Sequence, residues 1–174
     1  MRELADAERI RAFMRALGRE ARQPGRVLFT GGATAVLFGW RPSTIDVDIK
    51  LLPDQDALLR AIPKLKESLQ LNVELASPDD FIPVREGWAD RCPFIAQEGP
   101  LSFHHFEFVA QALAKIERGH AQDLGDVRTM VDRGLVTRAE LRETFAAVEP
   151  RLYRYPAIDP AAFARAVADI AGED

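Results

Sequence analysis

The segment from Thr30 to Leu52, TGGATAVLFGWRPSTIDVDIKLL, constrains this chain more than any other part of the sequence. A Gly-Gly turn follows a short apolar run and leads into a short helical pattern, and an alternating segment with Asp46 and Asp48 comes next. Residues two apart on a strand point to the same face of a sheet, so we expect the two carboxylates to share a face. Adjacent carboxylates repel one another, and a divalent cation that prefers oxygen ligands, such as Mg²⁺, removes that repulsion.

The Gly31-Gly32 turn is the candidate phosphate-binding element. Glycine lets the backbone approach a ligand closely, and free N–H groups at the start of the following helix, near Ala33 and Thr34, point toward an anion. A tight turn without a ligand is the alternative for a Gly-Gly pair on its own, and the P-loop and dinucleotide fingerprints are both absent. The turn and the two aspartates together indicate chemistry on a nucleoside triphosphate.

Composition sets the broad class of the protein. A chain of 174 residues with 47% hydrophobic and 29% charged residues fits one globular domain, with room for a small appended helical part. The net charge of -4 gives no global basic field for nucleic acid or membrane, although a local basic patch is compatible with it. Neither a signal peptide nor a membrane-spanning apolar stretch is evident, so we expect a cytoplasmic protein.

The hydrophobic pattern predicts the order of the secondary-structure elements. We predict helices over residues 4–19, 33–38, 53–70, 106–118, 123–132, 137–150 and 161–171, and strands over 27–29, 45–51, 71–75, 94–96 and 101–104. This order predicts an α/β or α+β fold with a helical C-terminal half.

Glu74 is the candidate third carboxylate. It lies on the polar face of the LNVEL strand, and it would join the two aspartates if that strand lies beside theirs. Three carboxylates can hold two Mg²⁺ ions. A surface acid is the alternative for Glu74, and the competing acids Asp79 and Asp80 fall in a loop where they would more simply cap a turn.

Two further groups of polar residues complete the candidate site. Arg41 and Thr44 lie in the loop before the acidic strand, where Arg41 could contact a phosphate. Lys115 and Arg118, three residues apart on a helix, share a face and could meet the triphosphate or the leaving pyrophosphate, and Asp123 could orient one of these cations. For each of these residues a solvated surface position is the alternative.

The Gly-Gly, helix and Asp-x-Asp arrangement resembles the nucleotidyltransferase superfamily that includes DNA polymerase β. GGATAVLFGWRPSTIDVDI looks closest to the bacterial abortive-infection-type toxin nucleotidyltransferases and related nucleotidyltransferase-like proteins, and AKIERGHAQDLGDV resembles their downstream Asp-Leu-x-Asp element. The likeness covers roughly residues 27–135. Two departures stand out: the second turn residue, Gly32, is Ser in many of these enzymes, and Lys50 follows the acids on the same strand face.

The resemblance implies a mixed β-sheet of about five strands flanked by helices, with a nucleotidyltransferase core over residues 1–135 and a C-terminal helical extension, 136–174, packed on it. It implies Mg²⁺-dependent transfer of a nucleoside monophosphate (NMP) from a nucleoside triphosphate (NTP). Catalytic and metal-binding roles fall on Asp46, Asp48 and Glu74. By position, Gly31 and Gly32 match the phosphate-binding turn, and Lys115 and Asp123 match the downstream helix pair. With Thr34, Arg41, Thr44 and Arg118, which are candidates from their own positions in the sequence, these residues form the expected nucleotide- and phosphate-binding set.

The partners that the resemblance implies are an NTP and an acceptor, which could be an RNA end such as a tRNA tip, a protein hydroxyl or a small molecule. A toxin–antitoxin setting with an antitoxin or HEPN-type protein partner fits this branch of the superfamily. Two alternatives stay open. One is a non-catalytic protein of the same fold that binds a nucleotide or a partner, and the other is a metal-dependent phosphohydrolase.

Overall fold

The computed structural model describes residues 2–172, and their contacts divide the chain into two compact units. Unit 1 contains residues 2–77 and 92–106, and unit 2 contains residues 78–91 and 107–172. The sequence-based boundary at residue 135 therefore differs from the division by contacts, which assigns all the helices after the last strand to unit 2.

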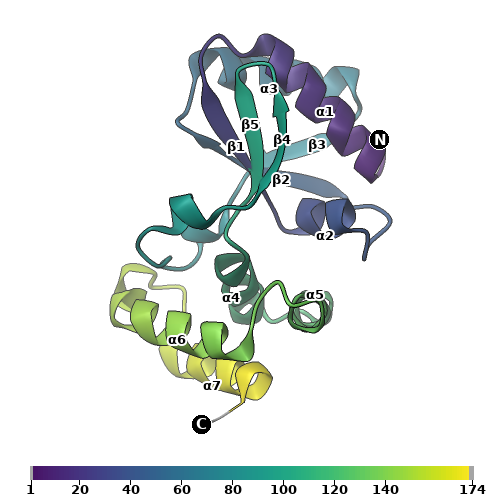
Figure 1. The fold of residues 1–174 in the computed structure, drawn as a ribbon. Helices are drawn as coiled ribbons and strands as arrows, with labels where there is room; N and C mark the ends of the chain where they lie inside the picture. Colours follow the sequence, from purple (N-terminus) through teal and green to yellow (C-terminus); the bar gives the residue numbers. More distant parts are fainter. Residues whose placement is uncertain (1, 173–174) are drawn as a thin grey trace. The chain divides into compact units, whose positions relative to one another are not determined.

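Unit 1 is built on a mixed five-stranded sheet with the strand order β3-β2-β1-β5-β4 (Figure 1). The strands are β1 (Gly25–Thr30), β2 (Asp46–Leu52), β3 (Asn72–Leu75), β4 (Phe94–Glu98) and β5 (Leu101–His105). The central strand β1 is antiparallel to β2 and parallel to β5, while β3 is parallel to β2 and β4 is antiparallel to β5. The predicted fold class, a mixed sheet of about five strands flanked by helices, is thus confirmed.

Three helices, α1 (Ala7–Glu20), α2 (Gly32–Phe38) and α3 (Asp56–Ser68), belong to the same unit. Helix α1 begins where the Asp6 side chain accepts a hydrogen bond from the Arg9 backbone N–H, and its apolar residues recur at helical spacing. The helices and one face of the sheet enclose a core that includes Ile10, Phe13, Leu17, Val27, Phe29, Val47, Ile49 and Phe103.

The alternation in β2 decides which face of the sheet carries the acids. Val47, Ile49 and Leu51 are buried in the core, whereas Asp46 and Asp48 alternate with them and are only half-buried. The strand begins at Asp46 rather than Ile45, and Ile45 is 70% exposed, so it does not belong to the apolar face that the pattern predicted. The two aspartates therefore lie on the sheet face opposite the helix-covered core.

Unit 2 is a helical assembly of α4 (Phe108–Arg118), α5 (Ala121–Asp132), α6 (Arg138–Val148) and α7 (Pro160–Ala171). A 3₁₀ segment, residues 149–154, lies between α6 and α7, and two more, residues 78–80 and 88–91, come from the part of unit 2 that precedes β4. Helix α4 contacts each of the other three helices. The predicted capping box of α6 is present, with Thr137 and Glu140 each accepting a hydrogen bond from the other's backbone N–H. Helices α6 and α7 pack through Phe145 and Phe163, whose ring centroids are 5.0 Å apart.

Within residues 2–172, no helix is long and apolar enough to cross a membrane.

Candidate functional site

The register between β2 and β3 brings the predicted acids together on one face. Asp48 is paired with Glu74 and Asp46 with Asn72 across the two parallel strands, and on the other side of β2 Asp48 is paired with Thr30. Paired residues on adjacent strands point to the same side of a sheet. Glu74, which was assigned only from its place on a strand, therefore shares a face with Asp46 and Asp48.

Asn72 is a site residue that the sequence reasoning missed. Its side-chain amide donates a hydrogen bond to a carboxylate oxygen of Asp46. The sequence does contain a signal for Asn72: it lies two residues before Glu74, which puts both polar side chains on the same face of one strand. An amide donor offsets part of the negative charge on Asp46 and fixes the orientation of that carboxylate.

The Gly31-Gly32 turn lies directly against the acidic strand and the loop before it. Gly31 has a φ of +64°, a conformation that favours glycine, and a Cβ built there would lie 3.2 Å from the Asp48 Oδ2 atom. A Cβ on Gly32 would lie 2.2 Å from the Thr44 hydroxyl oxygen and 3.6 Å from the Arg41 Nη1 atom. The structure thus brings Arg41 and Thr44 to the turn, as expected for one continuous site.

Thr44 also connects this loop to the start of β2. Its hydroxyl donates a 3.0 Å hydrogen bond to the backbone carbonyl oxygen of Asp46. The loop before the strand, the glycine turn and the first aspartate are therefore held together by specific short contacts.

We expect Gly32→Ala to damage this arrangement. The new methyl group would overlap the Thr44 side chain, and overpacking of this kind costs about 1–3 kcal/mol of unfolding free energy. The matched control is Gly125→Ala in α5, where no atom lies within 4 Å of the added Cβ and where alanine should stabilise the helix by about 0.5–1 kcal/mol. Urea unfolding of both variants gives the comparison, and equal effects would contradict the close packing at Gly32.

Thr34 has a different surrounding from the rest of the predicted phosphate-binding set. It is 1% exposed, and its hydroxyl is hydrogen-bonded to the His105 Nδ1 atom at 2.9 Å. The Thr34 side chain therefore ties α2 to the end of β5 inside unit 1, and we do not include it among the ligand-facing groups. The sequence could not show this, because the histidine partner lies 71 residues away.

His105 makes the stability of the protein sensitive to acid. Burial, aided by the neighbouring charge of His104, lowers the pKa of His105 from 6.5 to about 4. Between these two pH values the unfolded chain binds a proton at His105 that the folded chain does not bind. The contribution of the neutral His105 to the unfolding free energy is therefore fully present above pH 6.5 and is lost as the pH falls toward 4. The loss of unfolding free energy between pH 6.5 and 4 is about 3 kcal/mol.

A pH series of urea unfolding curves tests this expectation. His105→Gln should flatten the fall in unfolding free energy between pH 6.5 and 4, and His120→Gln, at an exposed position, is the histidine control. An equally steep fall in the His105→Gln variant would show that another group is responsible.

The residues predicted on the downstream helix pair form an ion-pair network within unit 2. Lys115 on α4 donates to Asp126 at 2.8 Å and lies 3.8 Å from Asp123, both on α5. Arg118 makes two hydrogen bonds to Asp123, at 2.8 and 2.6 Å. Asp126, which was not assigned from the sequence, is the second acid of the Asp-Leu-x-Asp element, so the motif itself carried the signal for it.

The electrostatics of this network depend on its burial. Lys115, Asp123 and Asp126 are 5%, 3% and 4% exposed, whereas the Arg118 side chain is 59% exposed. Burial alone would raise the pKa of the Asp123 carboxyl, but the hydrogen bonds and charge of Arg118 and the charge of Lys115 outweigh it and lower that pKa below its usual value. Asp123 therefore stays ionised and holds both cations in place.

The acids on the sheet face offer the donor chemistry of a Mg²⁺ site, because all three are carboxylates and two are adjacent on one strand face. Among residues 2–172, however, no three acidic, histidine or cysteine side chains converge closely enough to hold a metal ion. One oxygen of Asp46 accepts the hydrogen bond from the Asn72 side-chain amide. The carboxylate chemistry of these three residues suits a divalent cation, but their side chains do not converge on one point in the arrangement observed.

Comparison of the chain with protein-family models, with curated proteins and with solved structures gave no match.

Proposed function

We propose that the protein is a Mg²⁺-dependent nucleotidyltransferase that moves an NMP from an NTP to an acceptor hydroxyl. The observation that carries the proposal is the β2–β3 register, which sets Glu74 beside Asp48 on the face that also carries Asp46. The contact of the glycine turn with Asp48 supports it, because a phosphate-binding backbone and a metal-binding acid pair then adjoin one another.

Each group has a defined role in this proposal. The backbone of Gly31 and Gly32 binds the triphosphate, and Arg41 at the same turn contributes positive charge. Asp46 and Asp48, with Glu74, would hold Mg²⁺, which when bound neutralises the charge of the triphosphate. The roles that the resemblance implies for Lys115, Arg118 and Asp123 in phosphate binding stay predictions.

The bond changes follow from the chemistry of phosphoryl transfer. The acceptor oxygen forms a bond to the α-phosphorus, the bond from that phosphorus to the bridging oxygen breaks, and pyrophosphate leaves with the electron pair. Glu74 is exposed on the sheet face and accepts the proton of the acceptor hydroxyl. Positioning and charge stabilisation supply most of the rate. An NTP donor places the proposed reaction in the cytoplasm.

Incubation with each of the four α-³²P-labelled NTPs, Mg²⁺ and a cell extract tests the proposal. We expect label to enter RNA, protein or a small molecule with at least one NTP, together with release of pyrophosphate and loss of both signals in EDTA. Failure of all four NTPs to label any fraction would overturn it.

One observation favours a second function, a non-catalytic nucleotide-binding protein of the same fold. Asn72 engages Asp46 directly, and the acids do not converge in the arrangement observed. In that case equilibrium dialysis would detect NTP binding that persists in an Asp46→Ala variant, and the wild-type protein would release no pyrophosphate.

A further inference from the structure

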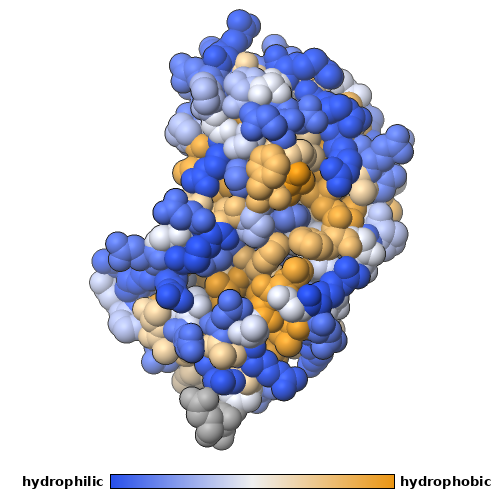
Figure 2. Space-filling model, viewed as in Figure 1, coloured by the Kyte–Doolittle hydropathy of each residue, from blue (hydrophilic) through white to orange (hydrophobic). Residues whose placement is uncertain are grey.

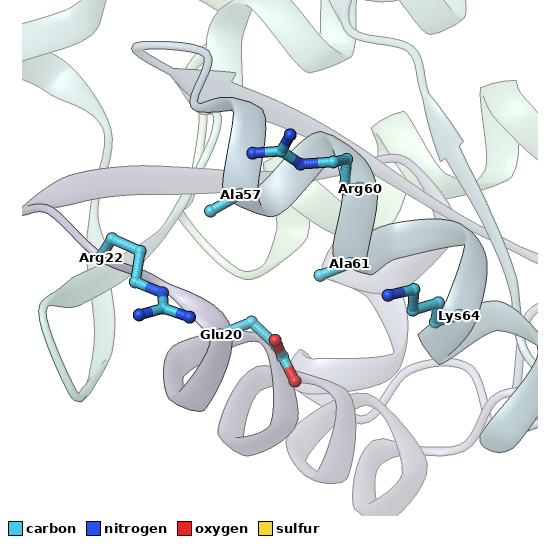
Figure 3. A pocket seen from close by; sticks show the side chains of 6 residues that line it. All are labelled: Glu20, Arg22, Ala57, Arg60, Ala61 and Lys64. Atoms are coloured by element: carbon cyan, nitrogen blue, oxygen red, sulfur yellow. The ribbon is translucent and has the colours of Figure 1, made fainter.

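A basic depression lies on unit 1 between the end of α1 and the outer side of α3 (Figure 3). Its volume is about 370 Å³. Ala57, Arg60, Ala61 and Lys64 line it from α3 at the spacing of one helix face, and Glu20 and Arg22 line it from the end of α1 and the residues that follow. The two alanines leave the floor free of bulky side chains.

Three cations and one carboxylate line the depression, so its net charge is positive. Arg22, Arg60 and Lys64 are all exposed, and none of their side chains makes an ion pair or hydrogen bond within residues 2–172. Some other basic residues, such as Arg9, Arg91 and Arg118, are each held by a carboxylate. Glu20 balances one of the three positive charges, and a bound anion would relieve the repulsion among the cations that remains.

The outer side of α1 carries further positive charge. Arg11, Arg15 and Arg19 recur every four residues, which places them on one face about 6 Å apart along the helix axis. All three are exposed and, in the described part of the chain, lack ion-pair partners. In Figure 2 the surface over α1, at the top of the view, is largely hydrophilic. A row of separate cations suits an extended ligand with repeated charges better than a compact one.

We infer that the depression and the α1 arginines form a docking surface for the phosphodiester backbone of a nucleic-acid strand. Arginine and lysine bind such a backbone by neutralising phosphates and releasing counterions, without a need for sequence-specific contacts. The surface lies on the helices that cover the core face of the sheet, so it is distinct from the acids on the opposite face. The proposal does not depend on nucleotidyl transfer, and the net charge of -4 does not oppose it because the cations are gathered locally.

Fluorescence anisotropy with the full chain and a labelled 20-nucleotide single strand, as RNA and as DNA, tests this surface without any NTP. We expect binding that weakens steeply with salt. The triple variant R22Q/R60Q/K64Q should bind roughly tenfold or more weakly, and the slope of log K against log salt should fall by about 2, as expected for three lost phosphate contacts on a single strand.

The matched control is R128Q/R138Q/R165Q, which removes the same charge from exposed arginines of unit 2 whose side chains also make no ion pair or hydrogen bond in the described chain. This control should bind as the wild type does, and circular dichroism should show both triple variants folded. Equal weakening in the two variants, no binding at low salt, or binding of free ATP but of neither strand would each overturn the proposal. An Asp46→Asn variant that binds the strand normally would separate this surface from the proposed transferase site.

Discussion

We expect the double substitution Asp46→Asn/Asp48→Asn to lower NMP transfer by about a thousandfold while the protein stays folded. Asparagine keeps the size of each side chain and removes both negative charges, so the face can no longer hold a divalent cation against a triphosphate. Removing two repelling carboxylates from one strand face should leave the unfolding free energy unchanged or slightly raised. The measurement is the initial rate of label transfer from the α-³²P NTP that the wild type uses.

Asp54→Asn is the control for a neighbouring charge, because Asp54 is an exposed acid just after the same strand; it removes one negative charge where the double variant removes two. Its rate should equal that of the wild type. A double variant that retained more than a tenth of the wild-type rate would remove the aspartates from the mechanism. Glu74→Gln, assayed beside it, should lose activity without loss of NTP binding if Glu74 accepts the proton.

The sequence predicted the strand face of the two aspartates correctly because the signals for it are local. The alternation of Asp46 and Asp48 with Val47 and Ile49 fixes the face of the strand within a few residues, and a one-residue change of register would bury the acids. Glycine at position 31 is likewise a local signal, since the positive φ is a property of that one residue.

Contacts between distant segments could not be predicted in the same way. The pairing of Asp48 with Glu74 depends on which strands are neighbours, and the bond between Asn72 and Asp46 follows from that pairing. Thr34 shows the same limit. Its position at a helix start suggested that it binds phosphate, but its hydroxyl is hydrogen-bonded to the buried His105 of β5. Periodicity gives the face of a residue and not its partner on another element.

Lys115→Met should produce the largest loss of stability of any single substitution considered for unit 2. Lys115 is buried between Asp126 and Asp123, and its removal takes away the cation that lies 2.8 Å from the buried Asp126 carboxylate, whereas Asp123 keeps its ion pair with Arg118. Breaking a buried ion pair by removing one partner typically costs about 3–5 kcal/mol, because the remaining charge pays its desolvation cost without compensation. Urea unfolding followed by circular dichroism measures the change.

A second variant separates the ion pair from the packing of the lysine stem. In Lys115→Met/Asp126→Leu both the cation and its closest acid are replaced by apolar groups, so much of the lost unfolding free energy should return. If instead the double variant is less stable than Lys115→Met, then Asp126 stabilises unit 2 through contacts other than Lys115. NTP binding by the Lys115→Met protein, measured at low temperature where it remains folded, also bears on function. Unchanged affinity would assign Lys115 to joining α4 and α5. Weakened NTP binding would support the phosphate contact that the sequence resemblance implies.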